Sequence, residues 1–272
     1  MRFFGKKKEQ ENTTEPQQTI VEPAITKNDG FETEIEESIK LVKDKLYEEA
    51  DKKLLAIIQN VPNNAIANFW LGRVKMGMRN LQGAEDYFKK ATALDPSNAD
   101  GFFWLGRTYE YNNKFEQALK AFEKAVELNP EIANYHVTYG QMLKHFGELK
   151  YAWNQFAKAI ELNPSPESTC PSDPYGELLG LLLNFKKFNR REWREIFEQA
   201  EQIYRSAVEA YPQESGFHSS LGWVLSVSAN KKIEAESEFR KALAINSEDP
   251  LALSQLDFRS KHLKEWYQMR VF

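Results

Sequence analysis

Apolar residues recur along this chain in blocks with helical spacing, and short polar turns separate the blocks. The block FEQALKAFEKAVEL, residues 115–128, places apolar side chains three or four residues apart, so that they share one face of a helix. The block before it, GFFWLGRTYEY, is also rich in apolar residues and ends at Asn112, a residue type that favours turns. Pro130 follows the second block and cannot continue a helix. The pattern therefore predicts two helices joined by a turn.

This two-helix block is repeated at a fixed interval. The quintet FWLGR occurs at residues 69–73 and again at residues 103–107, 34 residues further along. Five series of residues keep this step through three successive units, which predicts a stacked array of similar units. The series are Gly72, Gly106 and Gly140; Ala84, Ala118 and Ala152; Phe88, Phe122 and Phe156; Ala91, Ala125 and Ala159; and Pro96, Pro130 and Pro164.

The small residues in these series have a packing role. Gly106 in the first helix of a unit, with Ala118 and Ala125 in the second, allows the two backbones to approach closely. Phe122 fills the space beside them. We therefore expect the Leu-Gly part of the quintet to serve the crossing of helices rather than the binding of a ligand.

At these positions the chain resembles the tetratricopeptide repeat family, whose 34-residue pattern is W-x2-L-G-x2-Y, then A-x3-F, then P. The middle unit carries the Leu-Gly pair, Tyr109, Ala118, Phe122 and Pro130 at the matching places. The resemblance covers about residues 31–249 and is specific for a fold.

The chain departs from the family pattern at the leading tryptophan. Phe102 stands in that place in the middle unit, Asn68 in the unit before it and His136 in the unit after it. Trp70 and Trp104 lie two residues later than the family places its tryptophan. We therefore interpret these two tryptophans as different from the family's packing tryptophans.

The resemblance implies an all-α fold: a right-handed superhelical solenoid of about six helix-turn-helix repeats with a C-terminal capping helix. We expect residues 1–30, rich in Glu, Gln, Thr and Pro, to be a disordered tail, and residues 250–272 to form the cap. The fifth unit carries an insertion between its helices. The expected units span residues 31–64, 65–98, 99–132, 133–166, 173–214 and 215–249.

The resemblance also implies that the first helices of successive units line a concave face. Helical spacing on that face selects a set of aromatic, arginine and polar residues as the candidate protein-binding site. The set is Phe69, Trp70, Arg73, Phe103, Trp104, Arg107, Tyr111, Gln141 and Lys144.

Two interpretations of this set are open. In one, Phe69 and Phe103 pack between neighbouring first helices, and the arginines are solvated and stack on aromatic rings. In the other, which we favour, the aromatic and arginine side chains form a ladder that grips an extended peptide or a helix. Trp, Tyr and Arg are enriched in interface hot spots, and the repeat pattern does not require them here. The Lys and Asn pattern by which chaperone adaptors of the family hold a terminal carboxylate is absent, so we do not expect that ligand.

Composition narrows the functions further. The 272 residues carry a formal net charge of -4, so no overall basic field draws the chain onto nucleic acid. The single cysteine, Cys170, excludes an intrachain disulfide and fits a reducing compartment. The chain begins without the apolar core of a secretory signal, and its longest apolar run is too short to span a bilayer. We expect a cytoplasmic protein.

Two short segments suggest alternative functions. FKKFNRREWR, residues 185–194, mixes five basic residues with three aromatics, which suits nucleic acid as well as a solvated loop. MRFFGKKK, residues 1–8, carries four basic residues and two phenylalanines, which suits an anionic membrane as well as a solvated tail. A nucleic-acid-associated regulator and a membrane-tethered assembly factor are the alternatives.

No catalytic, cofactor-binding or metal-binding constellation stands out in the sequence. The four histidines are scattered without the spacing of a helical metal site. Cys170 lies in a Pro- and Ser-rich connection with no base nearby in the sequence. We therefore expect no enzyme, no cofactor and no metal, but a non-catalytic scaffold or adaptor that binds a protein or peptide in the concave groove.

Overall fold

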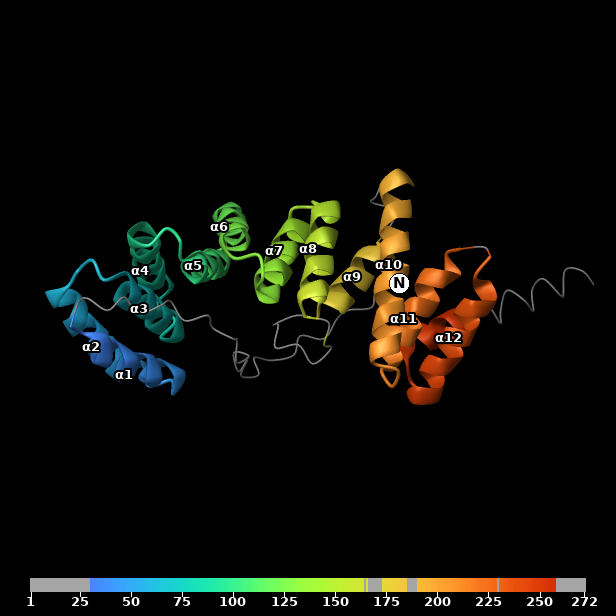
Figure 1. The fold of residues 1–272 in the computed structure, drawn as a ribbon, viewed down its shortest axis with the longest axis horizontal. Coiled ribbons are helices and arrows are strands. Elements are labelled where there is room, and N and C mark those ends of the chain that lie inside the picture. Colours follow the sequence, from blue (N-terminus) through green and yellow to red (C-terminus); the bar gives the residue numbers. More distant parts are fainter. Residues whose placement is uncertain (1–29, 164, 166–172, 185–189, 229, 258–272) are drawn as a thin grey trace, which may run out of the picture. The chain divides into compact units, whose positions relative to one another are not determined.

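A computed structural model of the chain describes residues 30–163, 165, 173–184, 190–228 and 230–257. These residues form helices and no strand, so the all-α helical-repeat fold expected from the sequence is confirmed (Figure 1). Residues 250–257 are also helical. The labelled helices are α1 (Glu32–Lys43), α2 (Tyr47–Asn60), α3 (Ala65–Gly77), α4 (Leu81–Leu94), α5 (Ala99–Tyr111), α6 (Phe115–Leu128), α7 (Ala133–His145), α8 (Leu149–Leu162), α9 (Pro174–Leu183), α10 (Arg190–Ala210), α11 (Ser215–Ser226) and α12 (Lys232–Ile245).

The helices belong to two compact units. The first contains α1 to α7 and Lys158–Asp173, and the second contains Glu148–Ala157 and α9 to α12, so that α8 contributes to both. In the first unit each helix packs on the next along the chain, and first helices also contact one another, α1 with α3 and α3 with α5. In the second unit α10 packs on α11, and α11 on α12.

Asparagine side chains begin three of the helices in the first unit. The side chain of Asn64 accepts a hydrogen bond from the backbone N–H of Ala67 at the start of α3. Asn80 caps α4 and Asn98 caps α5 in the same way. Each cap satisfies a backbone donor that the first turn of a helix leaves without an intrahelical partner.

The turn inside each repeat of the first unit contains one residue with left-handed backbone geometry. These residues are Lys45, Arg79, Asn113 and Gly147, with φ of 60°, 59°, 57° and 83°. The next residue's N–H then reaches back five residues, as from Leu46 to the carbonyl of Leu41 (2.8 Å). This 6→1 bond is the Schellman arrangement that ends a helix. The same 6→1 bond closes the second and third turns, from Asn80 to Lys75 and from Lys114 to Tyr109 (2.8 Å each).

Glycine allows the two helices of a repeat to touch, as the sequence predicted. A Cβ built on Gly72 would lie 2.7 Å from the ring of Phe88, and one on Gly106 would lie 2.7 Å from the ring of Phe122. Both distances are shorter than contacts that real Cβ atoms make, so a side chain at either position would push the helices apart. Gly180, in the irregular fifth repeat, has no such neighbour within 4 Å.

The inserted residues of the fifth repeat lengthen its second helix. Helix α10 has 21 residues, whereas the corresponding α4 and α6 have 14 each. Residues 185–189 of the insertion lie outside the described residues, as do almost all of the expected tail 1–30 and residues 258–272 of the expected cap.

Candidate protein-binding face

The nine predicted site residues lie on α3, α5 and α7, but their aromatic rings differ sharply in exposure. Trp70 is 0 % exposed and Trp104 is 5 % exposed. Both rings are therefore packed inside the array and do not present their faces to a ligand, as the ladder interpretation would require. Each ring packs edge-on against the phenylalanine before it, with centroids 5.4 Å apart for Trp70 and 5.6 Å apart for Trp104.

The two phenylalanines are buried as well. The ring of Phe69 lies 5.8 Å from that of Phe88 within its own repeat. Phe103 stacks on Tyr135 of the next repeat, with ring centroids 4.9 Å apart and planes 24° apart. The stack of Phe103 on Tyr135 matches the interpretation in which a phenylalanine packs between neighbouring first helices, whereas Phe88, the partner of Phe69, belongs to the second helix α4.

Arg73 lies over one of the buried tryptophans. Its guanidinium carbon, on α3, is 3.5 Å from the centroid of the Trp104 ring on α5, and 6.0 Å from the centroid of Trp70. A guanidinium group over an indole face is attracted by the negative charge of the ring face, and the attraction is stronger where water is partly excluded. Trp104 therefore holds the head of Arg73 in place.

An acidic side chain that the sequence did not single out lies beside this pair. Asp100 is 8 % exposed and accepts a 2.6 Å hydrogen bond from the hydroxyl of Tyr135. Burial raises the pKa of Asp100 above its ordinary value, and the Tyr135 hydrogen bond and the Arg73 charge oppose that rise. Burial and the nearby Asp100 carboxylate raise the pKa of Tyr135, so the phenol keeps its proton and remains a donor. This network joins α3, α5 and α7.

Arg107 is held on its own helix. Its Nη1 donates to Glu110 Oε2 at 2.8 Å, and its Nη2 donates to the hydroxyl of Tyr111 at 3.0 Å. Tyr111 is exposed, whereas Arg107 is half-buried. On α7, Gln141 is half-buried and Lys144 is exposed. A molecule approaching this face would therefore meet polar groups, and the buried rings beneath them belong to Phe69, Trp70, Phe103 and Trp104. We call these four rings the aromatic floor.

Family models match this chain over two adjoining stretches. Models described as tetratricopeptide repeat match residues 41–99 and residues 99–132, which contain both copies of the quintet. Residues 41–132 of the chain are therefore tetratricopeptide repeats. Among curated proteins, none matches its sequence.

Several solved structures share this fold. YrrB, described as a TPR protein with an unusual peptide-binding site, is 20% identical, and the match covers 75% of this chain and 97% of YrrB with a TM-score of 0.57. Pseudomonas aeruginosa pilF is 18% identical over 84% of this chain and 96% of its own, with a TM-score of 0.55. A tetratricopeptide repeat protein from Parabacteroides merdae is 19% identical over 80% of both chains, with a TM-score of 0.50. At these identities the likeness is one of fold.

The place of the missing tetratricopeptide-repeat tryptophan is taken in three repeats by a side chain that binds a backbone carbonyl. In each case a side-chain nitrogen reaches the carbonyl of a proline six residues earlier. Since a carbonyl only accepts hydrogen bonds, Nε2 of each histidine carries the proton. The pairs are Asn68 with Pro62 (3.2 Å), His136 with Pro130 (2.8 Å) and His218 with Pro212 (3.1 Å).

Buried glutamates join successive tetratricopeptide repeats, a feature that the sequence analysis missed. Glu85 of α4 is 2 % exposed and accepts hydrogen bonds from Lys89 (2.6 Å), Lys114 (2.7 Å) and Asn112 (3.2 Å). Burial alone would raise the pKa of Glu85, but the hydrogen bonds from Lys114 and Lys89 outweigh burial and lower it. Glu85 is therefore an ionised bridge between the second and third repeats.

The same kind of bridge recurs in the second unit. Glu201 of α10 accepts hydrogen bonds from Lys231 at 2.6 Å and from Arg205 at 3.0 Å. Lys231 immediately precedes α12, just as Lys114 immediately precedes α6. One sequence signal could have indicated both bridges. It is a glutamate on the second helix of one repeat, followed 29 or 30 residues later by a lysine in the turn of the next repeat.

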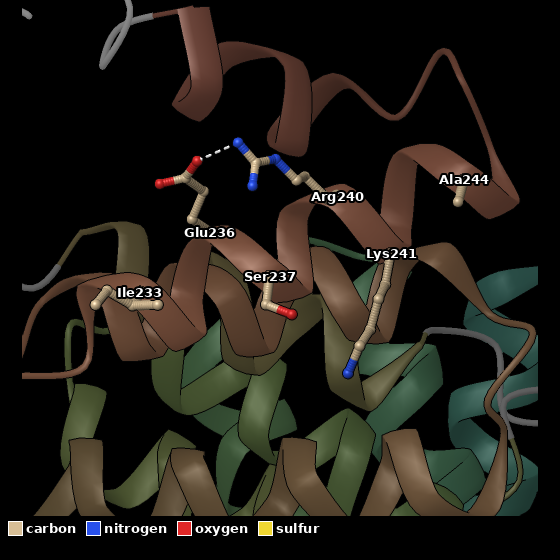
Figure 2. A pocket seen from close by; sticks show the side chains of 6 residues that line it. All are labelled: Ile233, Glu236, Ser237, Arg240, Lys241 and Ala244. Atoms are coloured by element: carbon tan, nitrogen blue, oxygen red, sulfur yellow. Dashed lines mark ion pairs between the residues drawn. The ribbon is translucent and has the colours of Figure 1, made fainter.

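Within the described parts of the chain, no group of three or more His, Cys, Asp or Glu residues could hold a metal ion, and no helix is long and apolar enough to cross a membrane. A shallow pocket lies on one face of α12, where Glu236 pairs with Arg240 at 2.5 Å (Figure 2). All six of its lining residues come from that helix.

The basic and aromatic segment 185–194 is described only at its end. Trp193 stacks on Phe197 with ring centroids 4.3 Å apart, and Phe197 also contacts Trp223. This aromatic residue of the segment thus packs within the second unit. The nucleic-acid alternative stays a prediction.

Proposed function

We propose that this protein is a non-catalytic scaffold that captures a peptide or helix of a partner protein on the face formed by α3, α5 and α7. The main observation in support of this proposal is that the Arg73 guanidinium lies 3.5 Å from the centroid of the Trp104 ring of the next repeat. Tetratricopeptide-repeat proteins are generally scaffolds, and the similar YrrB is described as having a peptide-binding site. The single cysteine fits a cytoplasmic location, which is part of the proposal.

The arginines would supply selectivity. A guanidinium group binds a carboxylate through two parallel hydrogen bonds, and a head already held in place loses less conformational freedom when it binds. Arg73 is held by Trp104, and Arg107 is held by Glu110 and Tyr111. A carboxylate of the partner would bind Arg73 beside Asp100 and would compete with Glu110 for Arg107. We therefore propose an acidic segment as the ligand.

The aromatic floor has a supporting part in this proposal. Since Phe69, Trp70, Phe103 and Trp104 are buried, they position the polar groups rather than enter the partner's surface. Arg73, Arg107, Tyr111, Gln141 and Lys144 would make the contacts. Arg and Tyr are frequent in interface hot spots, where a central residue is worth about 2 kcal/mol or more.

The test is affinity capture followed by mass spectrometry with the double variant Arg73→Gln/Arg107→Gln. The matched control is Lys90→Gln/Lys120→Gln, which removes two positive charges from exposed positions on the second helices α4 and α6. We expect the control to retain the partners of the natural chain and the groove variant to lose them, with unchanged helical content in both. Equal recovery of the same partners by both variants would contradict the proposal.

A further inference from the structure

The exposed large apolar side chains of the first unit lie at the turns inside its repeats. Among the described residues of this unit they are Leu46, Met78, Tyr111 and Phe146, which are 45 %, 41 %, 52 % and 38 % exposed. Each lies within two residues of a left-handed turn residue. We call these four side chains the turn row.

The turn row follows one edge of the first unit. The turns recur every 34 residues, as the positions of Lys45, Arg79, Asn113 and Gly147 show. First helices of neighbouring repeats pack side by side, α1 on α3 and α3 on α5, so the repeats stack in the same orientation. Their internal turns therefore come to the same edge, where the Tyr111 hydroxyl also accepts a hydrogen bond from Arg107 of the candidate binding face.

Basic side chains accompany the apolar ones along this edge. Lys45 precedes Leu46, Arg79 follows Met78, and all four side chains are exposed. Lys144 and His145 precede Phe146 and are exposed as well. The acidic neighbours are Asp44, Glu48 and Glu49 at the first turn, Glu110 and Glu116 at the third, and Glu148 at the fourth, and Glu110 pairs with Arg107. Exposed cations thus stand beside apolar tips on a chain whose formal net charge is -4.

We propose that the turn row docks the protein on an anionic lipid bilayer. Peripheral binding to a membrane surface combines a few apolar side chains at the level of the headgroups with basic side chains that attract anionic lipid. The turn row has both, on one edge. A stable protein interface buries about 1,200–2,000 Å² in a continuous, closely packed patch. Four half-exposed tips separated by polar and charged groups do not form such a patch, which favours a bilayer over a second copy of the chain.

The experiment is flotation of the full chain with vesicles made of equal parts phosphatidylcholine and phosphatidylglycerol. We expect the protein to float with these vesicles at low salt and to dissociate from them as salt is raised. It should not float with vesicles of phosphatidylcholine alone. A chain that ignores the anionic vesicles too would overturn the proposal.

The charge variant is Lys45→Gly/Arg79→Gly. Both residues have a positive φ, which glycine adopts without strain, so the fold is kept while two cations are removed. We expect membrane partitioning to weaken about fivefold for each charge removed. The matched control, Lys52→Gln/Lys90→Gln, removes two exposed lysines from α2 and α4 and should float as the natural chain does. Equal losses in both variants would mean that overall charge, and not this edge, drives binding.

The apolar variant is Leu46→Gln/Met78→Gln, and its control is Ile233→Gln/Leu253→Gln, which changes exposed apolar residues of the second unit. We expect only the first to reduce flotation. A third variant lacks residues 1–8, whose basic and apolar composition also suits a membrane. Flotation that depends on residues 1–8 and not on the turns would overturn the proposal. So would a shift from dimer to monomer in the turn variants, since a second copy would then be the occupant.

Discussion

The hydroxyl of Tyr135 donates a 2.6 Å hydrogen bond to the carboxylate of Asp100, which belongs to the preceding repeat. Both residues are buried, so the bond joins two repeats through groups that water does not reach. We expect Tyr135→Phe to lower the free energy of unfolding by about 1–3 kcal/mol, because it leaves a buried acceptor without its donor. Denaturation in urea, followed by circular dichroism, measures the loss.

Tyr139 provides the control on the same helix. Its hydroxyl donates to an exposed Glu123 at 3.4 Å, a long bond in a wetter place. We expect Tyr139→Phe to change stability by less than Tyr135→Phe. Equal losses of unfolding free energy in the two variants would show that the hydrogen bond to Asp100 stabilises the protein no more than the exposed bond to Glu123 does.

Alanine at Gly72 should destabilise the protein, whereas alanine at Gly180 should not. The added methyl group at Gly72 would lie 2.7 Å from the Phe88 ring, while Gly180 has open space. Overpacking costs about 1–3 kcal/mol, and a helix gains about 1 kcal/mol when alanine replaces an interior glycine. Thermal unfolding of the two variants should therefore shift in opposite directions. A Gly72→Ala variant as stable as the natural chain would contradict the close helix contact.

Acid should weaken the protein partly through Glu85. Hydrogen bonds from lysines, acting against burial, hold the pKa of Glu85 below its ordinary value near 4.5 in the folded chain. The unfolded chain then takes up a proton more readily, so stability is present above the ordinary pKa and is lost as pH falls through the lower, folded value.

The variant Glu85→Gln tests this sign. It should be less stable than the natural chain at neutral pH, and the difference between the two should shrink on the acidic side of the ordinary glutamate pKa. Urea unfolding at a series of pH values gives the comparison. A difference that stays constant down to strongly acidic solution would rule out the ionised bridge to Lys114.

The cap on α4 predicts a graded response at one residue. Asn80 Oδ1 accepts a 3.0 Å hydrogen bond from the N–H of Gly83. We expect Asn80→Ala to cost about 1 kcal/mol and Asn80→Gly only a few tenths, because glycine leaves the backbone groups open to water. Melting temperatures of the two variants in one buffer should rank in that order, and the reverse order would contradict the cap.

Sequence periodicity was sufficient for the helix pairs and for the contact between glycine and phenylalanine within a repeat. Gly72 and Phe88 each belong to a series that recurs every 34 residues, and the two residues touch within one repeat. Burial of Trp70 and Trp104 was missed because the family pattern describes packing inside a repeat. Whether a ring on a first helix is buried depends on the side chains of the neighbouring first helix. The 34-residue period does not indicate which of those side chains contact the ring.

The contacts between repeats were hidden for a related reason. Asp100 and Tyr135 are 35 residues apart, and Glu85 and Lys114 are 29 apart, so neither pair lies on the period. The corresponding places in neighbouring repeats also carry other residue types. Only the stacking of one repeat on the next brings these side chains together, and the ionisation of Glu85 follows from that stacking.

The left-handed turns show that the sequence is not the most stable one for this fold. Gly147 shows that glycine fits the fourth turn, yet Lys45 and Arg79 hold long cationic side chains in a backbone conformation that costs residues other than glycine about 1 kcal/mol or more. An engineer seeking only a higher melting temperature would place glycine at both positions. The natural sequence instead forgoes that gain, and so keeps two charged side chains exposed along this edge.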